Sequence, residues 1–61
     1  MTEIVNNILE RKIADIIDAR TRGSYAIEEV DAFSRAVLWA EGMGIDTQPY
    51  WNKSIEARGY K

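Results

Sequence analysis

The sequence predicts an all-α domain, in which an antiparallel helical hairpin is followed by a short third helix. Three observations predict this fold. Apolar residues recur at spacings of three and four along most of the chain. Glycines interrupt the pattern at Gly23 and again at Gly42 and Gly44. The chain has 61 residues, which is enough for one small domain, so residues 1–61 are treated as a single domain.

The first helix is expected to run from about Thr2 to Thr21. Thr2 can cap the first turn, and Glu3 lies where the helix dipole favours an acid. Gly23 suits the left-handed conformation that ends many helices. Seven large apolar residues cover roughly half of the helix circumference. They are Ile4, Val5, Ile8, Leu9, Ile13, Ile16 and Ile17. This helix therefore offers more apolar surface than one neighbouring helix would cover.

The second helix is expected to start at Ser24 as its N-cap and to end near Gly42, where two glycines permit a sharp change of direction. Asp31 and Arg35 form an i,i+4 pair with the acid first, which is the more favourable order. The expected apolar face consists of Ile27, Val30, Phe33, Val37, Leu38 and Ala40. Because the link to the first helix is short, the two helices are expected to form an antiparallel hairpin.

The third helix is expected within residues 46–61. Asp46 or Thr47 can cap it, the first turn tolerates Pro49, and Gly59 would end it. The expected apolar face consists of Trp51, Ile55 and Arg58. A helix of little more than two turns does not persist in water without packing. The aromatic residues of this segment are therefore expected to hold it against the hairpin.

Self-association is expected because the chain is small. A chain of this length buries only about 60% of its unfolded surface, and small domains often compensate with disulfides, metals or oligomers. The sequence contains no cysteine and no histidine, which excludes disulfides and zinc sites built on sulfur or imidazole. The predicted interface of a homo-oligomeric helix bundle consists of Val5, Leu9, Ile13, Ile16 and Val37. The alternative is that the third segment completes a monomeric three-helix core.

Charge and hydropathy argue against two classes of partner. The net charge of −2 gives no overall field that would attract nucleic acid or an anionic membrane. No apolar run approaches the roughly 18 residues of a membrane span. The first residues, Met1 to Ile4, lack the basic start and apolar block of a signal peptide. The expected location is the cytoplasm.

Catalytic chemistry and metal binding are not expected. Nucleophilic catalysis usually relies on a histidine base or a cysteine nucleophile, and the sequence contains neither residue. The serines are better explained structurally, Ser24 as a helix cap, Ser34 as a core-edge residue and Ser54 as a surface residue. Asp15 and Asp18 have the i,i+3 spacing of helical metal ligands, but they lie opposite the apolar arc and are expected to be solvated. We therefore expect no enzyme, no metal site and no cofactor.

The favoured hypothesis is a non-enzymatic helical protein-interaction module. Tryptophan and tyrosine dominate the residues that carry binding energy in protein interfaces. The predicted partner-binding residues are Trp39, Tyr50 and Trp51. A homo-oligomeric regulator or inhibitor of a larger macromolecule fits the small size and the lack of catalytic groups. Its expected partners are a second copy of the chain and another protein.

One alternative is an oligomer that binds and sequesters an anionic small molecule such as a nucleotide. Basic side chains in or beside the apolar arc would supply the positive charge, and a tyrosine at the hairpin turn would stack on a base. The candidate anion-binding residues are Lys12, Arg20, Arg22 and Tyr25.

A second alternative is a helix-turn-helix DNA-binding protein, because a glycine-containing turn joins the last two predicted helices. The residues available to contact bases or phosphates are Asn52, Lys53 and Arg58. Residues 24–47 carry five acidic side chains and one basic side chain, and they would lie close to the DNA phosphates. The charge pattern argues against this alternative.

Overall fold

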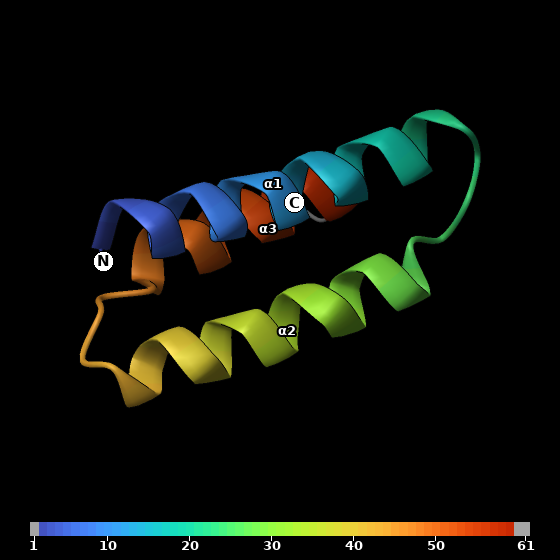
Figure 1. Ribbon diagram of the computed structural model, residues 1–61. Coiled ribbons are helices and arrows are strands. Elements are labelled where there is room, and N and C mark those ends of the chain that lie inside the picture. The colour runs from blue at the N-terminus through green and yellow to red at the C-terminus, as the bar shows by residue number, and fades with distance from the viewer. Residues whose placement is uncertain (1, 60–61) are drawn as a thin grey trace.

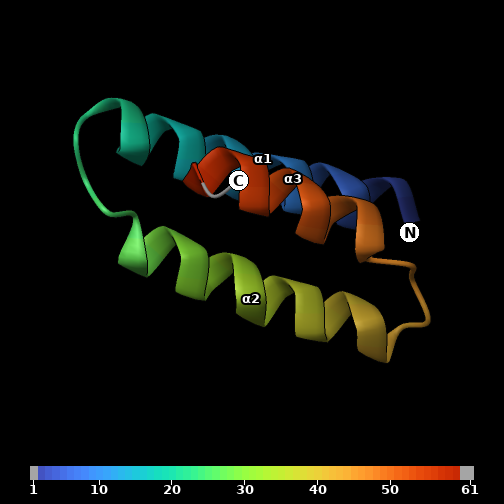
Figure 2. The same ribbon diagram turned by 180° about the vertical axis from the view of Figure 1, so that it is seen from behind.

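A computed structural model describes residues 2–59, and these residues form three helices without strands. The helices are α1 (Thr2–Thr21), α2 (Ile27–Gly42) and α3 (Gln48–Arg58). α1 and α3 run in the same direction and α2 runs in the opposite direction (Figure 1), and the view from behind shows the same arrangement (Figure 2). The predicted all-α fold, with a hairpin and a short third helix, is confirmed.

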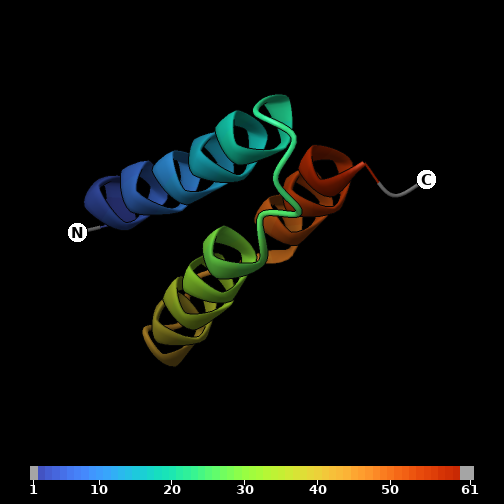
Figure 3. The same cartoon turned by 90° about the vertical axis from the view of Figure 1, so that its right-hand side faces the viewer.

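The bundle is organised around α1. This helix packs closely against both α2 and α3, whereas α2 and α3 approach each other less closely. Seen from the end that carries the link between α1 and α2, the three helices surround a common interior (Figure 3). A single chain therefore covers two sides of its long first helix.

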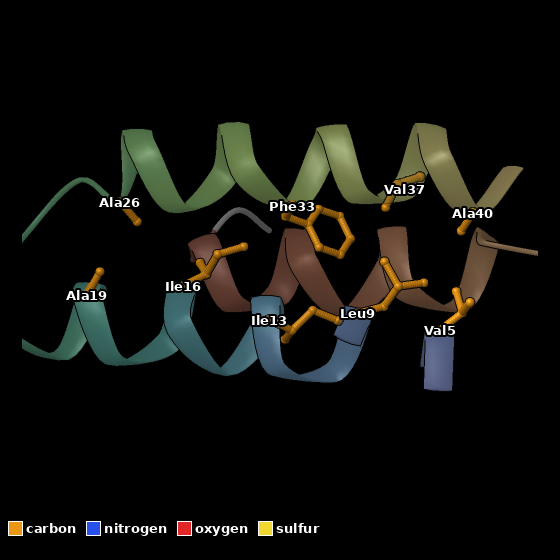
Figure 4. Packing of buried hydrophobic residues seen from close by; sticks show 9 residues of the cluster. All are labelled: Val5, Leu9, Ile13, Ile16, Ala19, Ala26, Phe33, Val37 and Ala40. Carbon is orange, nitrogen blue, oxygen red and sulfur yellow. The ribbon is translucent and has the colours of Figure 1, made fainter. Parts of the chain in front are cut away.

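Among the described residues, nine apolar side chains form the core of the chain. They are Val5, Leu9, Ile13, Ile16, Ala19, Ala26, Phe33, Val37 and Ala40. Figure 4 shows those of α1 and α2 facing one another, with Phe33 as the largest side chain in the middle. The alanines lie toward the two ends of the row, where their small size lets the helices approach closely.

The apolar arc of α1 is wider than the buried part of the helix. Ile4 is 59% exposed and Ile17 is 51% exposed, although both belong to the predicted arc. These residues lie at the two edges of the arc, beyond the part that α2 and α3 cover. The prediction that one neighbouring helix would not cover α1 is supported, because even two neighbours leave both edges in contact with solvent.

The start of α2 differs from the prediction. Ser24 is not its N-cap, because the helix begins at Ile27 after Ala26, whose backbone is left-handed with φ of 59°. The Ala26 methyl group is buried in the core, and its N–H donates a hydrogen bond of 3.0 Å to Ser24 Oγ. A left-handed residue other than glycine costs about 1–2 kcal/mol. Burial of the side chain and the hydrogen bond to Ser24 offset this cost, so Ser24 stabilises the turn that precedes α2.

The ends of α3 largely follow the predicted signals. Asp46 Oδ1 accepts a hydrogen bond of 3.1 Å from the first backbone N–H of the helix. Thr47 occupies the N-cap position, but its hydroxyl donates instead to Glu41 Oε2 over 2.7 Å and thereby joins the end of α2 to the start of α3. Gly59 ends the helix in the left-handed conformation, as predicted. Residues 60–61 of the predicted range lie outside the described residues.

The buried face of α3 agrees with the prediction at Trp51, which packs against the core together with Tyr50, and differs from it at Ser54 and Ile55. Ser54, predicted at the surface, is fully buried, whereas Ile55 is largely exposed. Trp51 and Ala57 pack against the core on the same side as Ser54. The buried hydroxyl of Ser54 donates to the Trp51 carbonyl over 2.8 Å and accepts from Arg58 Nη2 over 3.1 Å. Because both bonds are made within the helix, burial of this serine leaves no polar group unsatisfied.

Replacement of Gly42 and of Gly44 with alanine is expected to change the free energy of unfolding in opposite directions. Gly42→Ala should raise the free energy of unfolding by about 0.5–1 kcal/mol, since Gly42 is helical and a methyl group there meets no neighbour. Gly44→Ala should lower it by about 1–2 kcal/mol, because its φ is +80°. Urea denaturation of both variants checks this, and shifts of the same sign would contradict the backbone assignment.

Candidate functional site

The predicted oligomer interface lies inside the chain. Its five residues, Val5, Leu9, Ile13, Ile16 and Val37, belong to the core and are at most 5% exposed. The side chains that were expected to meet a second copy therefore meet α2 and α3 of the same chain. An oligomer built from this fold must use other residues.

Trp39 lies on the outside of α2 and is 48% exposed. It follows the buried residue Val37 by two positions, which is about 200° around a helix, so the indole points away from the core. Met43, one turn further along, is also exposed. Ala36 and Ala32 lie one and two turns before Trp39 on the same side of α2; both are half-buried, and Ala36 also touches the core. These four residues form what we call the Trp39 stripe.

The spacing of the Trp39 stripe is that of a helix-pairing seam. Its members, Ala32, Ala36, Trp39 and Met43, follow one another at intervals of four, three and four residues. This is the a and d pattern of two-helix packing. The core stripe of the same helix contains Phe33, Val37 and Ala40 and runs beside it. α2 and its C-cap residue Met43 therefore carry two adjacent apolar stripes. The core stripe is buried within the chain, and the Trp39 stripe touches the core through Ala36.

The other two predicted partner-binding residues are packed in the bundle. Trp51 is half-buried, and its ring meets the Phe33 ring edge-on, with centroids 5.4 Å apart and an interplanar angle of 88°. Such edge-to-face pairs contribute about 0.5–1.5 kcal/mol beyond burial. Tyr50 is also half-buried against the core. The three aromatic residues thus have different environments, and of the three only Trp39 is largely exposed.

An ion pair joins α3 to α1. Lys53 Nζ lies 2.7 Å from Glu10 Oε1, and the ammonium also lies 5.7 Å from the centre of the Tyr50 ring. The hydrogen bond to Glu10, together with the attraction of its charge, raises the pKa of Lys53 above its ordinary value. Both charged groups are about half exposed, so the pair orients the two helices and adds little to stability.

The candidate DNA-contacting residues take part in contacts within the bundle. Asn52 Oδ1 accepts a hydrogen bond of 3.2 Å from Gln48 Nε2, Lys53 pairs with Glu10, and Arg58 donates to Ser54. α2 and α3 run in opposite directions (Figure 1). In a helix-turn-helix motif the corresponding helices cross at about 90–120°.

The candidate anion-binding residues divide into separate groups. Arg20 and Tyr25 line the same hollow, where the end of α1 and the start of α2 meet. Arg22 is exposed and pairs with Asp18 one turn earlier on α1. Lys12 lies two turns before Arg20 and lines a different hollow on α1, near Ile8. The structure therefore brings together two of the four predicted residues.

A groove between α1 and α3 is a feature that the sequence analysis missed. Its volume is about 730 Å³, and Ile13, Ile17 and Ala57 supply its apolar part. Lys53 and Glu10 line it as well, and Arg20 lines it where α1 ends. The only sign of this groove in the sequence is weak, because Ile17 belongs to the apolar arc but lies at its edge.

Within residues 2–59, no group of three or more aspartate or glutamate side chains is placed to hold a metal ion. In the same part of the chain, every buried side-chain nitrogen and oxygen atom has a hydrogen-bond partner. None of the three helices combines the length and apolar character needed to cross a bilayer.

Comparison of the chain with protein-family models, with curated proteins and with solved structures gives no match.

Proposed function

We propose that the chain is a non-enzymatic helical interaction module, and that its Trp39 stripe pairs with the same stripe of a second copy. The observation that carries this proposal is the second apolar stripe of α2, in which Trp39 and Met43 remain exposed although the core of the chain, which Ala36 also touches, is already closed. An exposed tryptophan within such a stripe is typical of residues that carry binding energy in interfaces. Binding of a larger macromolecule by the module stays a prediction from the sequence.

The order of residue sizes along the stripe supports an antiparallel pair. The two alanines, Ala32 and Ala36, come first, and the two large residues, Trp39 and Met43, come second. When two copies of α2 run in opposite directions with the stripes in full overlap, each large residue faces an alanine of the other copy. This pairing is isologous, so a two-fold axis closes it as a dimer. A parallel pair would place Trp39 against Trp39 and leave a gap between the alanines.

The other side of α2 is less suited to this role. Leu38 is 65% exposed there, but its neighbours one turn away are Ser34 and Gly42. The exposed ion pair of Asp31 with Arg35, 3.2 Å apart, lies near Leu38 and keeps that surface polar. Leu38 thus provides a control position on the same helix that is also exposed but lies outside the stripe.

Disulfide trapping tests the arrangement, because the natural chain has no cysteine. The variants Ala32→Cys and Met43→Cys are oxidised separately and as a mixture. The antiparallel pair predicts a cross-linked species at twice the 7.0 kDa chain mass in the mixture, formed between one copy of each variant. Each variant alone should cross-link much more slowly, because the two identical positions would lie about 16 Å apart along the helix axis.

Two results of the cross-linking experiment would contradict the antiparallel pair. Rapid cross-linking of each variant alone, without enrichment of the mixed species, would indicate a parallel pair and contradict the proposal. Equal, slow cross-linking in all three samples would indicate random collision and would exclude pairing through this stripe. A Leu38→Cys sample gives the collision rate for an exposed cysteine on the same helix.

A further inference from the structure

A small hollow lies where the C-terminal ends of α1 and α3 meet the start of α2. It has a volume of about 440 Å³, and its described lining residues are Arg20, Tyr25, Ile27 and Arg58. This volume is within the range of about 300–1,000 Å³ that is typical of small-molecule pockets. The hollow lies away from the Trp39 stripe, so a ligand bound there is independent of the proposed pairing.

The fold brings together two arginines that are far apart in the sequence. Arg20 lies in the last turn of α1 and Arg58 at the end of α3, and these two helices run in the same direction (Figure 1). The link between α1 and α2 passes across the same end of the bundle and carries Tyr25 (Figure 3). Sequence spacing does not show that the two arginines lie close together, because their proximity depends on how far α3 extends along α1.

Contacts with the backbone orient both guanidinium groups. Arg20 Nη1 donates to the Ser24 carbonyl over 3.3 Å, and Arg58 Nε donates to the Ser54 carbonyl over 3.4 Å. Each charge also complements the negative end of its own helix. These roles are compatible with ligand binding, since a guanidinium group has five N–H donors arranged in a planar fork.

The described lining of the hollow contains two arginines. None of its described lining residues is acidic. The nearest acidic side chains of α2, Glu28 and Glu29, line a separate hollow, which shares Tyr25 and Ile27 as a common wall. Paired arginines are well suited to hold a phosphate, because the guanidinium fork matches the geometry of its oxygens.

The remaining two lining residues favour a flat apolar group. Tyr25 is 81% exposed and Ile27 is 75% exposed, so neither side chain is used by the core. An exposed tyrosine ring offers a face on which an aromatic base can stack. We propose that this hollow binds a nucleotide-class ligand, in which a phosphate lies between Arg20 and Arg58 and the attached base stacks on Tyr25.

Titration of the ¹⁵N-labelled chain with AMP tests this proposal by NMR, with adenosine and inorganic phosphate as separate probes at physiological salt. AMP should cause saturable shifts that are largest at the amides of Arg20, Tyr25, Ile27 and Arg58. Adenosine and phosphate should each bind at least about tenfold more weakly than AMP, because each makes only part of the contacts. Absence of saturation with AMP, or binding of phosphate alone as tight as that of AMP, would overturn the proposal.

Two variants and a control separate a specific site from general charge attraction. Arg20→Gln and Tyr25→Ala should each weaken AMP binding by about tenfold or more while the helical circular dichroism is kept. Arg35→Gln removes the same charge from an exposed arginine on another part of α2, and it should leave the affinity within about twofold. Equal weakening by Arg20→Gln and Arg35→Gln would show that charge alone attracts AMP, which contradicts a built site.

Discussion

Replacing Phe33 with alanine is expected to unfold most of the chain at 25 °C. Phe33 is fully buried, is the largest side chain of the core (Figure 4), and meets Trp51 of α3 edge-on. Truncation of a buried phenylalanine costs about 3–5 kcal/mol. A single core of this size supplies about 3–5 kcal/mol in total. Because the two quantities are similar, the folded state should no longer dominate, and far-ultraviolet circular dichroism with a thermal scan will measure this.

Leu38→Ala is the matched control for Phe33→Ala. Leu38 lies on the same helix and is also a large apolar residue, but it is mostly exposed. Its replacement should change the free energy of unfolding by no more than about 0.5 kcal/mol. If both variants lost similar stability, the core would not be where the structure places it. If Phe33→Ala kept a cooperative transition near that of the natural chain, the packing around Phe33 would be wrong.

Replacing Trp39 with alanine is expected to weaken self-association by about thirtyfold while leaving the fold of the single chain intact. Central tryptophans in interfaces contribute about 2 kcal/mol or more, and each 1.4 kcal/mol is a factor of ten in the dissociation constant. The folded chain should tolerate the change because Trp39 lies outside the core. Association stabilises the folded state by mass action, so the melting temperature of the natural chain should rise with concentration.

The dependence of melting temperature on concentration distinguishes a role of Trp39 in pairing from a role in the stability of the single chain. Trp39→Ala should remove most of this dependence, whereas Leu38→Ala should retain it. A variant that melts earlier at every concentration by the same amount would indicate that Trp39 supports the fold and not the pairing. Trp51→Ala should lower the melting temperature by the same amount at every concentration, because the Trp51 ring packs on Phe33.

The sequence predicts the helices better than it predicts their ends. Thr2–Thr21 is recovered because its apolar pattern is dense and Gly23 marks its end clearly. The start of α2 is missed because Ala26 is left-handed, a conformation that alanine rarely adopts and that depends on burial of its methyl group. The buried face of α3 is predicted at Trp51 but missed at Ser54 and Ile55, because a short helix with few apolar residues has no clear periodicity and the burial of Ser54 depends on how α3 packs.

The candidate sites are predictable from the sequence only in part, because some of them depend on contacts between helices. An exposed Trp39 follows from its position off the main apolar face of α2, and the sequence contains that information. Whether Trp51 is exposed depends on contacts between helices, and the Phe33 contact decides it. Arg20 and Tyr25 are near each other in the sequence and are found together, whereas Arg58 joins them only through the tertiary fold. Lys12 lies too far along α1 to reach this group.

Pairing through the Trp39 stripe is expected of a chain whose core is already closed. Molar mass in solution tests it most directly, measured by light scattering behind a sizing column over a tenfold range of concentration, for the natural chain and for Trp39→Ala. Pairing through the stripe should give twice the chain mass of 7.0 kDa for the natural chain and a shift toward 7.0 kDa for the variant as the sample is diluted. A natural chain that remains at 7.0 kDa throughout, or a dimer that Trp39→Ala leaves unchanged, would contradict it.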